Sequence, residues 1–267
     1  MRYSVWLTRV GLALLVAASI DALAATSAQA ASTGVASVVE TTKVNYKAAK
    51  GKQNKVVVTL AGRTITIDDT VAIKAGKGCK EVKGDKTKVR CTTRTAPTRV
   101  RVYTYDRNDS ITNKASLPST LNGGTGSDTI VGGPRADLIN GDNGNDKIWG
   151  AGGNDTIYPD LGNDVSHGGD GADLIMDVGG KFVSNDWMYG DNGDDTAFGF
   201  AGSDHIFGGF GDDFLSGGAD ADYIDGGYGG DYLIGNDCLA GDPVGNCTAK
   251  DTLIGGPGIN TIVTSSH

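Results

Sequence analysis

The feature that most constrains the fold is a nine-residue period that runs from Gly123 to Val263. Fourteen frames share it, two of them interrupted, and an aspartate stands at the sixth position of thirteen. A fixed period of this kind is typical of a solenoid, in which each repeat packs on its neighbours and cannot fold alone. The sixth-position residues are Asp128, Asp137, Asp146, Asp155, Asp164, Asp173, Asp186, Asp195, Asp204, Asp213, Asp222, Asp231, Asp251 and Asn260.

The eighth position is apolar in almost every frame. Its residues are Ile130, Ile139, Ile148, Ile157, Ser166, Ile175, Met188, Ala197, Ile206, Leu215, Ile224, Leu233, Leu253 and Ile262. The three residues after each aspartate fit a short strand, whose middle side chain points inward and is removed from water. The period therefore predicts an all-β fold with one buried aliphatic side chain per repeat.

The turn before each strand combines a carboxylate with several glycines, which suits calcium. Calcium takes six to eight oxygen ligands, so one carboxylate needs help from backbone carbonyls. Glycine adopts positive φ without strain and lets a turn aim several carbonyls at one point. The candidate metal-site residues are the thirteen aspartates above and the turn glycines Gly124, Gly126, Gly133, Gly144, Gly153, Gly171, Gly193, Gly202, Gly211, Gly227 and Gly229.

Frames such as GGTGSDTIV, residues 123–131, resemble GGxGxDxUx, the RTX or hemolysin-type calcium-binding nonapeptide. The resemblance implies a parallel β-roll with two repeats per turn and an ion between loops two repeats apart. Asp128 would then face the loop of Asp146, and Asp137 that of Asp155. The unbroken repeats imply about seven calcium ions, and more if the interrupted copies stay in register. A metal-free β-solenoid that uses its Gly-Asp pairs only as turns is the alternative.

Some frames depart from the pattern. Arg135 and Asp220 stand where a fourth-position glycine is expected, and Arg135 would bring a cation close to an ion. Asn260 keeps a side-chain oxygen for the turn but drops the charge, so it is interpreted as the closing cap of the roll. Insertions near 177–180 and 235–245 are either binding loops or tolerated surface excursions.

The chain divides sharply by charge, with +11 over residues 32–121 and −20 over residues 122–267. Short β-branched runs such as RVRVYTY, residues 99–105, alternate as half-buried strands do. We therefore expect a small basic β-domain over residues 31–118, before the β-roll of residues 119–264. Its lysines could bind an anionic cell-wall polymer, or they could form a solvated face or balance the acidic half. No motif predicts a nucleic-acid partner.

The first 30 residues fit a signal peptide. Arg2 and Arg9 precede an apolar run of 11 residues, and Ala28-Gln29-Ala30 fits cleavage after Ala30. The run falls short of the roughly 20 residues that span a bilayer. The mature chain is therefore expected to be secreted and extracellular, without a membrane span.

The four cysteines form two local couples, Cys79 with Cys91 and Cys238 with Cys247. Outside the cell an even count suggests disulfides, and proximity favours these two among the three connectivities. Metal binding by the cysteines is the weaker alternative, because neither couple is CxxC and no histidine lies nearby.

No catalytic constellation is evident. The basic half contains no histidine, and no HExxH, Walker A or nucleophile-elbow motif occurs in the required context. The family's proteases and lipases carry separate catalytic domains beside their repeats. The sequence therefore predicts a non-enzymatic, secreted calcium-binding protein. An adhesin or envelope-binding protein that uses the basic domain is the alternative, and a secreted enzyme with an RTX module is less favoured.

Overall fold

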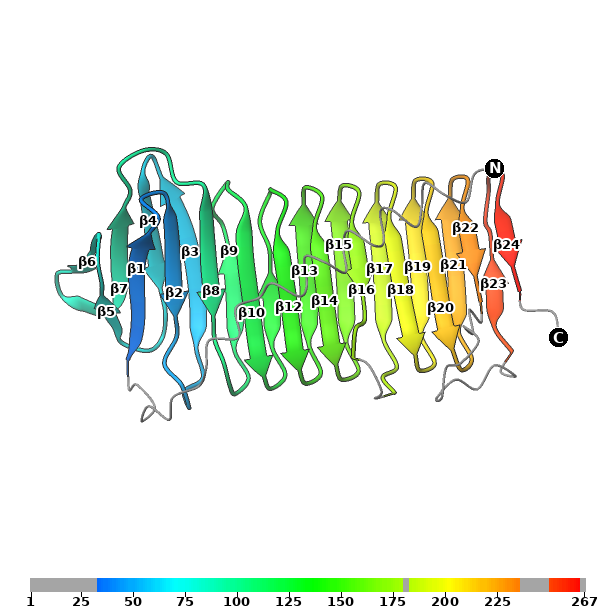
Figure 1. The fold of residues 1–267 in the computed structure, drawn as a ribbon, viewed down its shortest axis with the longest axis horizontal. Coiled ribbons are helices and arrows are strands. Elements are labelled where there is room, and N and C mark those ends of the chain that lie inside the picture. The colour runs from blue at the N-terminus through cyan, green and yellow to red at the C-terminus, as the bar shows by residue number, and fades with distance from the viewer. Residues whose placement is uncertain (1–32, 180–182, 236–249, 265–267) are drawn as a thin grey trace. The chain divides into compact units, whose positions relative to one another are not determined.

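The computed structural model describes residues 33–179, 183–235 and 250–264, which form an all-β structure (Figure 1). The predicted signal peptide, Cys238 and Cys247 lie outside the described residues. The strands are β1 (Gly34–Val39), β2 (Lys43–Lys47), β3 (Lys55–Ala61), β4 (Thr64–Asp68), β5 (Ile73–Ala75), β6 (Cys79–Val82), β7 (Asp85–Thr92), β8 (Arg99–Tyr103), β9 (Ser110–Asn113), β10 (Ser119–Thr125), β11 (Thr129–Val131), β12 (Leu138–Asn143), β13 (Lys147–Gly152), β14 (Thr156–Leu161), β15 (Val165–Asp170), β16 (Leu174–Met176), β17 (Trp187–Asn192), β18 (Thr196–Ala201), β19 (His205–Phe210), β20 (Phe214–Ala219), β21 (Tyr223–Tyr228), β22 (Tyr232–Ile234), β23 (Thr252–Ile254) and β24 (Thr261–Val263). The described part of the chain contains no helix with the length and apolar character needed to span a membrane.

The described strands form two sheets of twelve strands each. In the repeat region successive strands alternate between the sheets, and each pairs in parallel with the strands before and after it in its own sheet, as β12 does with β10 and β14. The register places Ile139 beside Ile157, which stand at the same position two frames apart. Two frames thus complete one turn of a parallel β-solenoid, which confirms the predicted fold class.

A single column of side chains fills the space between the sheets of the solenoid. The eighth-position residues from Ile130 to Leu233 are at most 2% exposed, and this includes Ser166. All of these residues except Ser166 contribute one apolar group per repeat, so the column is narrow and a polar side chain interrupts it at Ser166. Burial of one such apolar side chain stabilises the folded solenoid by only about 1.5–3 kcal/mol. The turns must therefore contribute a large share of the free energy of unfolding.

The basic strands continue the same two sheets. Strand β8 pairs in parallel with β2 and β10, and β9 pairs in parallel with β3 and β11. Antiparallel pairs β1–β2, β3–β4, β4–β7 and β6–β7 complete this end. Both sheets therefore cross residue 118 without a break. The Cys79–Cys91 disulfide joins β6 to β7, as the sequence predicts.

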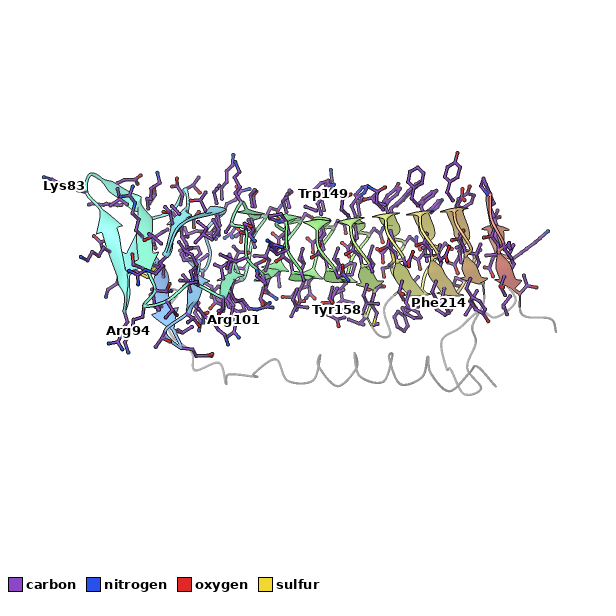
Figure 2. All side chains as sticks on the ribbon, turned by 90° about the horizontal axis from the view of Figure 1, so that it is seen from above. Lys83, Arg94, Arg101, Trp149, Tyr158 and Phe214 are labelled. Carbon is purple, nitrogen blue, oxygen red and sulfur yellow. A yellow bond between two sulfur atoms is a disulfide. The ribbon has the colours of Figure 1, made fainter. Side chains whose placement is uncertain are left out.

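Aromatic side chains line the outer faces of both sheets, and Trp149 and Tyr158 project from opposite sides of the solenoid (Figure 2). On the face of β13, β15, β17 and β19, the Trp149, His167, Tyr189 and Phe207 rings lie within 6° of parallel to their neighbours, with centroids 4.4–6.0 Å apart. Ladders of this kind stabilise parallel strands in register. The rings cover one another's faces, so they do not offer a flat aromatic platform.

Candidate metal-binding turns

The sixth-position aspartates lie in the turns at both edges of the solenoid. The twelve from Asp128 to Asp231 are at most 4% exposed, and Asp251 is half-buried. A buried carboxylate is costly unless it is hydrogen-bonded and neutralised. Each turn therefore needs a partner for both carboxylate oxygens.

The first oxygen, Oδ1, has a backbone partner. The N–H of Asp128 donates to Oδ1 of Asp146, and the N–H of Asp146 donates to Oδ1 of Asp164, at 2.7 and 2.6 Å. The same bond recurs along both edges, for example from Asp137 to Asp155 at 2.7 Å. The structure thus stacks loops two repeats apart, as the resemblance implies.

The second oxygen, Oδ2, has no hydrogen-bond partner among the described residues in ten of these turns. They are the turns of Asp128, Asp146, Asp155, Asp164, Asp173, Asp186, Asp195, Asp204, Asp213 and Asp231. In the first of them, Oδ2 of Asp128 and the carbonyl oxygen of Gly141 both lie within 3.0 Å of the point where a Cβ on Gly123 would sit. Two electron-rich oxygens thus converge on one space without a donor, an arrangement that a cation completes.

The fourth-position glycines permit this stacking. Gly144 has φ 140°, and a Cβ there would collide with the carbonyl oxygen of Gly126 in the preceding loop of the same edge. The second position is less restrictive, because Asp142 stands there with φ 69°, in the left-handed region. Of the candidate glycines, Gly133 does not adopt a positive φ in the structure.

The turn of Asp137 differs from the others. Its Oδ1 accepts the N–H of Ser119 at 2.5 Å, and its Oδ2 accepts the N–H of Gly133 at 2.6 Å. The sequence of this frame contains Pro134 and Arg135. Both carboxylate oxygens of Asp137 therefore already have N–H donors, although its Oδ2 still lies near the carbonyl oxygen of Gly150, as in the regular turns.

The turn of Asn260 shows what the space can hold when the second oxygen is replaced by an amide. Its Oδ1 accepts the N–H of Asp231 at 2.7 Å, like the aspartates. Its Nδ2 donates to the carbonyl oxygens of Gly255 and Gly256 at 2.6 and 3.1 Å. A hydrogen-bond donor at the place of the aspartate Oδ2 therefore links the Asn260 side chain to the turn carbonyls.

Asp109 is a comparable residue that the sequence analysis missed. It is 4% exposed, its Oδ1 accepts the N–H of Asn54 at 2.6 Å, and its Oδ2 has no partner among the described residues. Tyr105 and Arg107 stand where glycines are expected and have φ 75° and 79°. The signal in the sequence was Asp109 followed two residues later by Ile111, but the missing glycines hid it.

Burial raises the pKa of these carboxyl groups far above 3.8, and neighbouring carboxylates add to the effect. The pKa is about 6 for Asp146 and Asp173, about 7 for Asp128, Asp186 and Asp213, about 8 for Asp155 and Asp195, and about 9 for Asp164 and Asp204. Without a cation, many of these turns would therefore hold a proton at neutral pH.

Side chains alone do not build a complete metal site. No group of three or more His, Cys, Asp or Glu side chains suited to a metal gathers within the described ranges. Any cation in the turns must take part of its ligands from backbone carbonyls. The residues fit this requirement in seven of the ten turns, where a carbonyl oxygen from the next turn along the same edge lies near the orphaned Oδ2 at the first-position glycine.

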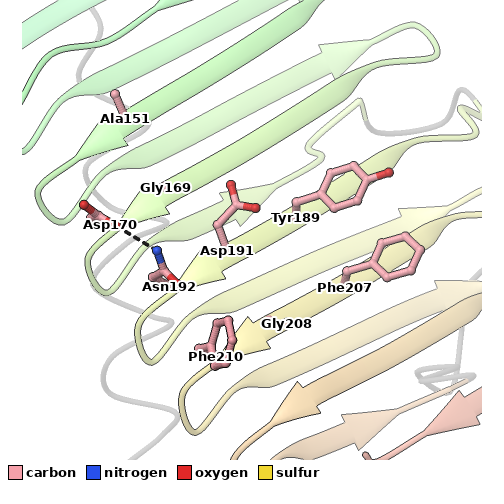
Figure 3. A pocket seen from close by; sticks show the side chains of 10 residues that line it. Ala151, Gly169, Asp170, Tyr189, Asp191, Asn192, Phe207, Gly208 and Phe210 are labelled. Carbon is pink, nitrogen blue, oxygen red and sulfur yellow. Dashed lines mark hydrogen bonds between the residues drawn. The ribbon is translucent and has the colours of Figure 1, made fainter.

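A shallow depression lies on the outer face beside one row of turns (Figure 3). Tyr189 and Phe207 line one side, Gly208 and Gly209 contribute to its floor, and Asp191 projects into it. The carboxylate of Asp191 lies 3.1 Å from Nδ1 of His167.

Together, the parallel solenoid and its oxygen-lined turns define a repeat protein whose turns are suited to hold metal ions. The model of the RTX calcium-binding nonapeptide repeat matches residues 122–157, 131–166, 158–176, 183–215 and 208–237. Residues 122–176 and 183–237, which these matches cover, therefore carry RTX calcium-binding nonapeptide repeats. No curated protein matches the sequence.

Proposed function

We propose that this chain is a secreted, non-catalytic calcium-binding protein whose solenoid folds around several calcium ions. The observation that carries the proposal is the buried Oδ2 atom that recurs without a donor among the described residues in ten turns and that, in seven of them, lies near a backbone carbonyl of the next turn. Calcium is a hard cation that prefers such oxygens, and it would neutralise each carboxylate where it lies.

The protein offers these carboxylates little internal compensation. The ion pairs within the described residues join Lys43 to Glu40, Lys88 to Asp68 and Asp85, and His167 to Asp191, so none involves a sixth-position aspartate. Removing one partner from a buried charge is costly, and the carboxylates of the ten turns have no ion-pair partner among the described side chains. Binding of an ion supplies it.

Calcium is expected to contribute about as much as the rest of the fold. A site with Kd near 10⁻⁴ M, in about 1 mM calcium, gains roughly 1.4 kcal/mol, and ten such sites gain on the order of 14 kcal/mol. This matches the whole stability of a typical domain. The solenoid is therefore expected to fold on meeting extracellular calcium, after export by the predicted signal peptide.

Calorimetric titration of the purified chain with calcium tests the proposal. We expect several ions per chain, with heat that includes folding. The turn of Asn260 should not contribute an ion, because its Nδ2 already donates to the turn carbonyls, and the turn of Asp137 should bind more weakly, because the N–H of Gly133 already donates to its Oδ2. Absence of calcium binding at millimolar concentrations would contradict the proposal.

The absence of catalysis belongs to the same proposal. His167 is stacked between Trp149 and Tyr189, and His205 between Trp187 and Tyr223, so both rings serve the outer ladders. Such packing suits a structural part for these histidines better than a general-base role.

A second candidate function is binding of an anionic envelope polymer by the basic strands. Lys83, Arg94 and Arg101 project outward from these strands (Figure 2). Lys43 and Lys88 are the lysines that form ion pairs within the described residues, so other lysines remain available. Co-sedimentation of the full chain with anionic cell-wall material should decline between low and high salt. No sedimentation at low salt would remove this candidate.

A further inference from the structure

The repeat register is interrupted between β16 and β17 (Figure 1). A second buried carboxylate, that of Asp177, lies at this interruption. Met176 pairs with Phe198, so Asp177 occupies the place that Gly199 takes one turn later. Asp177 is 2% exposed and its N–H donates to the carbonyl of Phe198 at 3.1 Å. A first-position glycine is thus replaced here by an aspartate.

The surrounding residues hold Asp177 in one orientation. Its Oδ1 accepts the N–H of Gly179 at 3.1 Å. Its Oδ2 accepts the hydroxyl of Ser184 at 2.7 Å, and Ser184 is 3% exposed. Asp177 precedes the insertion and Ser184 follows it, so described residues from both sides of the insertion meet at this carboxylate.

The sixth-position aspartate of the same turn is Asp186, which is 1% exposed. Its Oδ1 accepts the N–H of Asp164 at 2.7 Å, as in the regular turns. No N–H or O–H from the described residues reaches its Oδ2. In regular turns this oxygen fills the space over a first-position glycine, as Asp204 does over Gly199. Here that position carries the Asp177 side chain.

The two carboxyl groups influence each other. The pKa of Asp186 rises to about 7 because of burial and the charge of Asp177, and burial also raises the pKa of Asp177. A cation between them would neutralise both groups.

We propose that Asp177 and Asp186 form a calcium site of higher affinity than the regular turns, with Ser184 as the residue that positions Asp177. This inference rests on the proposed calcium-binding function and goes beyond it, because the regular turns have one carboxylate and this turn has two. Calcium affinity rises with the number of charged ligands and with the rigidity of the site. The insertion is then a specialised binding loop, and its site fills first.

Competition titration of the full chain against a chromophoric calcium chelator tests this inference, because it resolves the tightest binding constant. The wild-type chain should show one ion bound more tightly than the rest. Asp177→Asn should weaken that constant about tenfold or more while the total number of ions stays the same. Asp194→Asn, which removes the same charge from an exposed turn position, should leave the tightest constant unchanged.

Folding of each variant is checked by circular dichroism at saturating calcium. If Asp177→Asn does not fold, Ser184→Ala serves in its place, because it retains both carboxylates and loses only the bond to Asp177. It should weaken the tightest constant several-fold. A tightest constant unchanged by Asp177→Asn, or by its substitute Ser184→Ala, would overturn the inference, and so would equal affinity at all wild-type sites. A wild-type chain that binds no calcium would instead overturn the proposed function itself.

Discussion

Asp195→Asn should make the solenoid need less calcium to fold, although it removes one calcium site. The Asn260 turn shows the reason, because there the amide keeps the backbone bond through Oδ1 and donates from Nδ2 to the turn carbonyls. The same amide at position 195 would accept the N–H of Asp173 and supply the donor that the carboxylate lacks.

The magnitude follows from the carboxyl group that is removed. Burial raises the pKa of Asp195 from 3.8 to about 8, so folding without calcium at pH 7 requires that it take up a proton. Each pKa unit is worth about 1.4 kcal/mol, so the 3.2 units between 3.8 and pH 7 cost about 4 kcal/mol. Asparagine avoids this cost, whereas the lost ion contributes roughly 1.4 kcal/mol when calcium is about tenfold above Kd.

The assay is far-ultraviolet circular dichroism during a calcium titration at pH 7. Asp195→Asn should lower the calcium concentration at half-folding and reduce the bound ions by one. Asp195→Ala is the matched control, because it removes the same carboxyl and the same ion but leaves the N–H of Asp173 without an acceptor, which costs about 1–3 kcal/mol. It should therefore lower the midpoint less than Asp195→Asn does, and an equal or larger lowering by Asp195→Ala would refute the reasoning from Asn260.

Three further predictions follow from the structure. In chelator, β-structure should be greatest at or below about pH 4 and should be lost progressively as pH rises from there through about 6–9, because the raised aspartate pKa values favour the folded state only while its carboxyls are protonated; circular dichroism that improves with pH would contradict this. Gly144→Ala should destabilise the calcium-loaded protein by roughly 2 kcal/mol or more in urea unfolding, because φ at Gly144 is 140° and the added Cβ would meet a carbonyl oxygen. Asp142→Ala should have a small effect by comparison. Equal effects of the two substitutions would count against the argument that the backbone at Gly144 requires glycine. Reduction of Cys79–Cys91 should cost about 3 kcal/mol in the same assay and leave the calcium stoichiometry unchanged, because the bond joins strands outside the repeats; a lower stoichiometry would show coupling that the fold does not explain.

The sequence predicted the solenoid well because two sets of residues show the same nine-residue period, the sixth-position aspartates and the eighth-position aliphatic residues. The position of Ile139 beside Ile157 follows directly from that period. The stacking of Asp128 on Asp146 follows from it as well. Periodic features are easy to recognise because each copy repeats the same local physics.

Features that depend on one copy could not be predicted in this way. The Asp137 turn is satisfied by its own Gly133 N–H, which no pattern reveals. Asp109 was missed because Tyr105 and Arg107 adopt glycine-like φ without being glycines. The continuity of both sheets across residue 118 was also hidden, since composition changes there although strand pairing does not.

The account's central claim is that calcium completes the buried turns and so holds the repeats folded. Far-ultraviolet circular dichroism of the purified chain at pH 8, in chelator and then in millimolar calcium, tests it most directly. We predict a large gain of β-structure on adding calcium, reversed by excess chelator. The same β content in chelator as in calcium would contradict the claim.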